Sequence, residues 1–317
     1  FAGDFRQQGL NSYWYVPGLD PATAKSNSNV QMTVLEQGPV LTSISIVSNA
    51  PGASRLERIL SLYAHSKEVE IENIVDKKAI REKEGLHFGF PFHASLADAT
   101  LDAGYGSWKY LNDQLPGSNM DFLCARRWVD VSAPDRGLQM MLLEAPMIEP
   151  AAMVDERRTV NGSLKEWKTA GQPTATWFSY AMNNYWHTNY KADQGGIAHF
   201  HYALRPHGMF NHTEMEKAAA AFTQPLVGVP VREDARFDNN LFELTNNRIV
   251  ATAVVPNANG GFLVRLFNPE PSVQATRFQW NDLQPGSITS MKTSLQHPVN
   301  QEFELAAMGL AEFLIKP

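Results

Sequence analysis

The segment Val40-Leu41-Thr42-Ser43-Ile44-Ser45-Ile46-Val47 decides the fold class. It is rich in β-branched residues, and the break Gln37-Gly38-Pro39 separates it from a similar run, Val30 to Leu35. Two such runs joined by a short break with glycine and proline are typical of a β-hairpin. Runs of this kind recur along most of the chain, so the sequence predicts an all-β protein.

Alternation of polar and apolar residues extends this prediction in both directions. The run from Val69 to Val75 places Glu70 and Glu72 on one face and Ile71 on the other, the period of a half-buried strand. Further strands are expected at 56–63, 122–131, 138–143, 177–182, 197–204, 242–244, 248–255, 262–267, 273–278 and 311–315. Many short strands separated by turns indicate sandwich architecture.

Other segments interrupt the strands. The residues from Ala97 to Pro116 are rich in Gly and Tyr and predict a long ordered loop, while Glu149 to Gln172 predicts a surface excursion. One short helix is expected from Glu214 to Phe222, because Thr213 and Glu216 fit a capping box ahead of an Ala run.

Composition narrows the possible functions of this chain of 317 residues. Its formal net charge of −6 disfavours nucleic acid, which requires a basic surface. No apolar run reaches the roughly 20 residues that span a bilayer, so we expect a soluble protein without a membrane partner. Its compartment stays open between cytoplasm and periplasm. The single cysteine, Cys124, is predicted to be a buried, inert thiol because it lies in an alternating strand.

The stretch Tyr180-Ala181-Met182-Asn183-Asn184-Tyr185-Trp186-His187-Thr188-Asn189-Tyr190 is aromatic and rich in amides, with almost no charge. Flat rings beside neutral hydrogen-bonding groups suit a polyhydroxylated ligand, since rings stack on C–H faces while amides bind hydroxyls. The alternative is a loop whose rings pack against the sandwich and whose amides cap turns.

A second polar loop, Asn112 to Asn119, turns at Pro116-Gly117, and it either faces a ligand or is held by its own hydrogen bonds. The residues predicted to face a carbohydrate are Asp113, Gln114, Asn183, Asn184, Tyr185, Trp186 and His187.

Catalytic motifs are not recognisable in the sequence. It has no G-x-S-x-G, no P-loop, no G-x-G-x-x-G and no H-E-x-x-H pattern. His199 and His201 share one face of a predicted strand, but hydrogen-bonded histidines are favoured over metal ligands there. No catalytic or metal residue is therefore assigned, and no cofactor is expected in this chain.

Five sequence blocks occur in an order that resembles bacterial α-mannosidases of glycoside hydrolase family 38, in their C-terminal β-rich region. The blocks are Asp113 to Ser118, Arg127 to Ser132, Glu144 to Met147, Met182 to Tyr190 and Tyr202 to His207, with flanking pieces at Gly9 to Gly18 and Val264 to Pro269.

The resemblance implies a supersandwich like that of galactose mutarotase, followed by a small β-sandwich. It places the first domain at residues 1–227, and the first strands of that domain could be absent from this chain. A connector follows at 228–240, and the small sandwich occupies 241–317. It also implies that the zinc ligands and the nucleophile of a retaining α-mannosidase belong to an N-terminal catalytic domain of the parent protein. That domain would be the partner of this chain. The chain would form part of the wall of an α-mannoside cleft and would be inactive alone.

Two alternatives stay open at the level of sequence. The chain could be a stand-alone carbohydrate-binding module, or it could be an enzyme like sugar mutarotases and epimerases. The latter requires a His and a carboxylate facing each other across a concave sheet, and it rests on fold analogy alone.

Overall fold

The computed structural model describes residues 9–92, 98–159, 167–186, 191–224, 226–228, 230–232, 241–281 and 285–316. The chain divides into two compact units. The first unit comprises Phe1–Gly104 and Trp108–Phe210, and the second comprises Tyr105–Ser107 and Asn211–Pro317.

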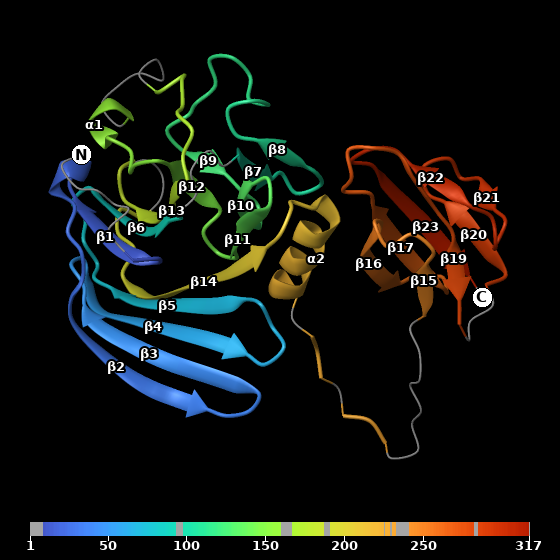
Figure 1. Cartoon of the computed structure of the whole chain (residues 1–317), viewed down its shortest axis with the longest axis horizontal. Helices are drawn as coiled ribbons and strands as arrows, with labels where there is room; N and C mark the ends of the chain where they lie inside the picture. Colours follow the sequence, from blue (N-terminus) through green and yellow to red (C-terminus); the bar gives the residue numbers. More distant parts are fainter. Residues whose placement is uncertain are drawn as a thin grey trace. The chain divides into compact units, whose positions relative to one another are not determined.

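Two β-sheets build the first unit (Figure 1). The smaller sheet has the order β1 (Ser12–Pro17), β6 (Glu84–Pro91), β13 (Thr176–Asn183), β12 (Met147–Pro150) and β9 (Leu123–Cys124). The larger has the order β2 (Ser28–Gln37), β3 (Leu41–Asn49), β4 (Ala53–Tyr63), β5 (Val69–Lys77), β14 (Gly196–His207), β11 (Arg136–Leu142), β10 (Trp128–Ala133), β7 (Asp98–Asp102) and β8 (Ser107–Lys109). This arrangement confirms the predicted all-β supersandwich.

The core of the first unit lies between these sheets. Phe88 and Phe90 alternate along β6, and their rings pack on Tyr202 of β14 at centroid distances of 5.9 and 5.1 Å. Leu56 of β4 and Ile71 of β5 belong to the same buried cluster. Side chains at every second position thus face inward, as the sequence alternation predicts.

The inward face of the larger sheet continues beyond this core. The register places Ile71, Leu60, Ile44 and Val34 opposite one another across four strands, so their side chains share one face. Exposure rises along this row from 4% at Ile71 to 58% at Val34. In Figure 1 the strands β2 to β5 run side by side, with β2 at the edge.

Smaller sheets build the second unit. A five-stranded sheet has the order β16 (Val250–Pro256), β17 (Phe262–Phe267), β23 (Leu310–Lys316), β20 (Ser287–Ser290) and β21 (Gln296–His297). Two strand pairs accompany it, β15 (Phe242–Leu244) with β19 (Phe278–Trp280) and β18 (Gln274–Thr276) with β22 (Phe303–Leu305). Their core includes Val264, Leu266, Phe278 and Ile315.

The described helices are more numerous than the one predicted. The short helix α1 spans Glu156–Thr159, a 3-10 turn spans Pro21–Thr23, and α2 spans His212–Thr223. The cap of α2 differs from the predicted capping box. Asn211 is the N-cap, and its side chain accepts from the Glu214 amide at 2.9 Å, while the Thr213 hydroxyl donates to Glu270 at 2.7 Å.

The boundary between domains was predicted at residue 227, whereas contacts group α2 with the second unit. Much of the predicted connector 228–240 lies outside the described residues, so the connector stays a prediction.

The prediction of a buried Cys124 is wrong, because the thiol is free and exposed. The two-residue strand β9 lies at the edge of its sheet, and Leu123 occupies the inward position. Alternation then turns the next residue, Cys124, away from the core.

Candidate functional site

The aromatic, amide-rich stretch begins at the end of β13 and continues into a loop. Asn184 is 2% exposed, and its side-chain amide donates to the carbonyls of Ile80 at 3.0 Å and Glu82 at 3.3 Å. It also donates to the carbonyl of Ala192, while its backbone amide donates to Glu84. Asn184 therefore ties separate loop segments to the end of β6.

Tyr185 is 1% exposed and is packed by its aromatic neighbours. Its ring meets Trp186 edge to face, with centroids 6.2 Å apart, and lies 6.4 Å from Tyr180. Gly85 leaves room for this ring, since a Cβ there would lie 2.7 Å from the Tyr185 hydroxyl oxygen. Burial raises the pKa of Tyr185 above its ordinary value, with Glu156 adding to the effect. These contacts favour the packing interpretation at Asn184 and Tyr185.

The second predicted loop is held by its own hydrogen bonds. The exposed Asp113 carboxylate accepts from the Lys109 amide at 2.7 Å, and the Gln114 side chain accepts from the Leu111 amide at 3.1 Å. Such bonds favour the turn interpretation of this loop.

The structure describes only some of the other predicted positions. Asn183 and Trp186 are half-buried, and His187 lies outside the described residues. The carbohydrate-facing role of the predicted set stays a prediction.

A buried polar cluster that the sequence does not indicate lies next to Tyr185. His87 of β6 stacks on Tyr180 with centroids 4.5 Å apart, and its Nε2 lies 3.2 Å from an oxygen of Glu149 on β12. The Tyr180 hydroxyl donates to Glu156 at 2.6 Å. Burial raises the pKa of Tyr180 well above its ordinary value, with the charge of Glu156 as the next cause.

A second buried set continues along β6. The Glu84 carboxylate accepts from Tyr15 at 2.7 Å and from the Lys77 ammonium at 2.5 Å, and both charged side chains are almost fully buried. Strand β6 is buried on both faces, since each residue of Glu84–Phe90 is buried, and the sequence alone does not show this. A strand covered on both sides requires its polar side chains to be paired.

The His87–Glu149 pair has the residue types that the mutarotase-like alternative requires. Yet His87 is 2% exposed and Glu149 is fully buried, so a sugar has no access to them. The pair therefore gives that alternative no support, and its burial fits a structural contact in the core.

The two histidines of β14 share one face of the strand, as predicted, and this face is the outward side of the larger sheet. His199 lies 2.8 Å from Glu72, and His201 lies 2.6 Å from Glu144 and 3.4 Å from Glu72. The two rings are parallel, with centroids 6.3 Å apart. This ladder agrees with the interpretation of hydrogen-bonded histidines.

A third histidine borders a pocket of about 450 Å³ in the first unit. His207 Nε2 lies 2.6 Å from Asp130, which also accepts from the Ser132 hydroxyl, and Nδ1 lies 2.9 Å from the Gly208 carbonyl. The pocket walls are mainly apolar, with Phe92, Val131 and Leu138 among them. Both ring nitrogens of His207 contact other groups, so this side chain serves to hold the local structure in place.

Over the described ranges, no group of three or more His, Cys, Asp and Glu side chains is arranged to hold a metal ion. Likewise, none of the described helices has the length and apolar character needed to cross a membrane.

Comparisons with known proteins relate this fold to glycoside hydrolases. A crystal structure of a glycosyl hydrolase family 38 protein from Enterococcus faecalis is 13% identical, with a TM-score of 0.72 over 97% of this chain. An α-mannosidase from Enterococcus faecalis V583 is 12% identical, with a TM-score of 0.70 over 97% of this chain. The chain spans only 40% and 38% of those two proteins.

No curated protein matches the sequence. The family model described as "Glycosyl hydrolases family 38 C-terminal domain" matches residues 6–145, which contain three of the five ordered blocks in whole or in part. The resemblance found in the sequence is thereby confirmed, and residues 6–145 carry the C-terminal domain of glycosyl hydrolase family 38.

Proposed function

We propose that the chain is the C-terminal region of an α-mannosidase-like glycoside hydrolase, that it supports a catalytic part of the same polypeptide and that it is inactive alone. The family match over residues 6–145 and the likeness to two much longer family 38 proteins support this proposal. The substrate would be an α-mannoside, the substrate class that the name of the second relative indicates.

The observation that carries the proposal is the uncovered apolar face of β2, β3 and β4, here called the β2–β4 face. Its apolar side chains are Met32, Val34, Ile44, Ile46, Leu60 and Leu62, and Thr42 and Arg58 share the face at its borders. Met32, Val34 and Leu62 are 64%, 58% and 50% exposed. The opposite side of the same strands is mixed: it carries Gln31, Thr33, Ser43, Ser45 and Ser61 together with Val47 and Ile59, so apolar side chains are more concentrated on the β2–β4 face.

An apolar sheet face next to a core, beside a more polar opposite face, is typical of a surface that another protein part covers. We assign the β2–β4 face to the catalytic part, since the related proteins extend well beyond the region matched here. The zinc ion and the nucleophile belong to that catalytic part in this proposal, and no residue of this chain receives a catalytic role.

The activity of the chain alone tests the proposal directly. Purified chain is incubated with an aryl α-mannoside and Zn²⁺, and release of the aryl group is followed. We expect no turnover by the chain and turnover by the longer parent protein. Robust turnover by this chain would overturn the assignment of catalysis to another part.

A matched pair of variants tests the β2–β4 face. Met32 and Thr33 are adjacent on β2 and point to opposite sides. We expect Met32→Asp to weaken binding of the separately produced catalytic part, because burying a Met side chain contributes about 1.5–3 kcal/mol. Thr33→Asp is the control and should bind as the unchanged chain does. Equal binding by both variants would place the interface elsewhere.

A further inference from the structure

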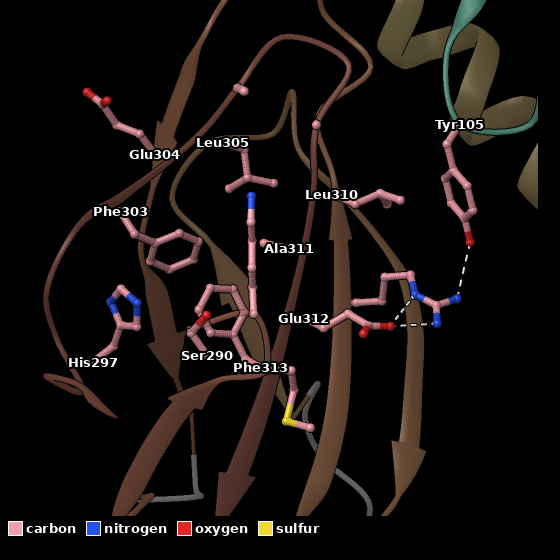
Figure 2. A pocket seen from close by; sticks show the side chains of 15 residues that line it. Tyr105, Ser290, His297, Phe303, Glu304, Leu305, Leu310, Ala311, Glu312 and Phe313 are labelled. Carbon is pink, nitrogen blue, oxygen red and sulfur yellow. Dashed lines mark hydrogen bonds and ion pairs between the residues drawn. The ribbon is translucent and has the colours of Figure 1, made fainter. Parts of the chain in front are cut away.

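The second unit contains a pocket of about 830 Å³ that the proposed function does not use (Figure 2). Strands β17, β22 and β23 contribute to it, together with the residues after β20 and Tyr105. Its volume falls in the range of roughly 300–1,000 Å³ that is typical of small-molecule sites. The pocket belongs to the second unit alone, since Tyr105 is grouped with that unit.

The charged side chains that line the pocket carry equal numbers of positive and negative charges. Arg265 and Lys292 are cationic, and Glu304 and Glu312 are anionic. Balanced charge disfavours a phosphate or another anion, which would require an excess of cationic groups. Four charged side chains also disfavour a purely apolar ligand, because their desolvation would be unfavourable.

A fixed pair of planar groups occupies one side of the pocket. Arg265 and Glu312 are directly opposite on β17 and β23, and the guanidinium Nε and Nη2 donate to one carboxylate oxygen at 2.7 and 2.6 Å. Nη1 donates to the Tyr105 hydroxyl at 3.2 Å (Figure 2). The side chains therefore present donors and acceptors side by side, the pattern that adjacent hydroxyl groups of a neutral ligand can match.

Aromatic and apolar surface lies on another side. Phe303 is half-buried and packs against His297 and Phe313, with centroids 6.1 and 4.8 Å apart. Figure 2 shows Phe303 and His297 next to each other, with Leu305 nearby. Tyr105, 40% exposed, adds a second ring on the side of the Arg265–Glu312 pair. Such rings can stack on the C–H faces of a sugar.

The wall formed by β22 is held rigidly. The fully buried Asn268 side chain donates to the carbonyls of Leu305 at 3.2 Å and Ala306 at 2.8 Å, and also to Ser272. The turn that follows is tight, since a Cβ on Gly309 would lie 2.7 Å from the Ala306 carbonyl oxygen. A preformed wall reduces the entropy that binding would otherwise lose.

From these contacts we infer that the pocket of the second unit is a binding site for a neutral saccharide. The hydroxyl groups contact the Arg265–Glu312 pair, and a sugar ring lies against Phe303. This inference goes beyond the proposed function, because it concerns binding in the second unit and requires no catalytic part.

Titration of the full chain tests the site. The probes are α-1,2-mannobiose and maltose, with inorganic phosphate as the anionic arm, and binding is followed by calorimetry and by amide chemical shifts in NMR spectra. We expect a disaccharide to bind and to perturb residues around Phe303, and phosphate to leave them unchanged. Absence of binding by both disaccharides, or binding of phosphate alone, would overturn the inference.

Two glutamates provide a control pair. Glu312 lines the pocket and pairs with Arg265, whereas Glu302 does not line it. We expect Glu312→Ala to weaken disaccharide binding tenfold or more, because hydrogen bonds to charged groups are strong. Glu302→Ala should bind within about twofold of the unchanged chain. Equal affinity of the two variants would contradict the assignment.

A further variant removes the ring and keeps the apolar packing. Phe303→Leu should retain the fold, as judged by the NMR spectrum, and lose most of the affinity. A chain that binds the disaccharide but does not associate with a catalytic part would retain this inference and overturn the proposed function. The converse result would do the opposite.

Discussion

Tyr180 connects the aromatic stretch to the buried carboxylates. Its hydroxyl donates to Glu156 at 2.6 Å inside the protein, where water does not replace a lost donor. We expect Tyr180→Phe to lower the free energy of unfolding by about 1.5–3 kcal/mol, the contribution of a hydrogen bond to a charged group. Urea denaturation measures this change.

Tyr63→Phe is the control for that experiment. Tyr63 lies on β4 and is 40% exposed, so its hydroxyl can exchange protein contacts for water. Its removal should change the free energy of unfolding by less than about 0.5 kcal/mol. Equal losses in both variants would show that the bond to Glu156 has no special role.

The buried tyrosines also predict a loss of stability in alkali. Burial raises the pKa of Tyr180, Tyr185 and Tyr15 above the ordinary value, in each case with help from nearby glutamates. Below about pH 10 these groups are protonated in both folded and unfolded chains, so their contribution does not vary with pH. Above that pH the unfolded chain releases the protons first, and the free energy of unfolding falls.

Urea denaturation at about pH 9 and pH 11 measures this slope, with each tyrosine contributing up to about 1.4 kcal/mol per pH unit. Tyr180→Phe should reduce the slope by one proton. A slope that is unchanged in this variant would mean that Tyr180 ionises equally in both states.

Individual residues show where sequence reasoning is limited. Alternation predicted the shared face of His199 and His201 correctly, because that property depends only on the strand period. It was wrong for Cys124, since exposure there depends on which strand ends the sheet. The pairing of His87 with Glu149 joins residues far apart in the chain, so no local pattern contains it.

At the scale of elements, the helix α2 offers a test of its cap. Asn211 accepts from the Glu214 amide at the helix N-terminus, a group that the helix itself leaves without a partner. We expect Asn211→Ala to lower the free energy of unfolding by about 1 kcal/mol, measured by thermal or urea denaturation. Asn211→Asp retains the acceptor and should preserve stability; a loss as large as that of Ala would contradict this role.

The strands that were predicted correctly are those whose positions are determined by packing alone. Expected strands at 30–35, 40–47, 56–63 and 69–75 correspond to β2, β3, β4 and β5. The expected loop from Ala97 to Pro116 instead contains β7 and β8, and the expected strand at 122–131 is split into β9 and β10. Short strands obtain their order from partners in the sheet rather than from local propensity, so a single sequence does not reveal them.

The predicted candidate site had a similar outcome at this scale. The loop of Asp113 and Gln114 and the loop after β13 were each recognised as polar and ordered. Whether such a loop faces a ligand or the sandwich depends on which other segments pack over it, and the composition of the loop does not show this. Asn184 illustrates the point, because its amide satisfies buried carbonyls from other loops.

At the scale of the whole chain, two separate hydrophobic cores predict two unfolding events. Leu56 is fully buried in the core of the first unit, and Leu266 is fully buried in that of the second. Replacing either by Ala should cost about 2–5 kcal/mol, through lost burial and the cavity that remains. Because the cores are distinct, we expect each variant to lower a different transition in differential scanning calorimetry.

The exposed Leu295 gives the control for these two variants. It is 65% exposed, so Leu295→Ala should leave both transitions in place. If Leu56→Ala and Leu266→Ala instead lower one common transition by the same amount, the two units unfold cooperatively as one. In that case destabilisation of the second unit would also weaken the β2–β4 face, and binding of the catalytic part would depend on both cores.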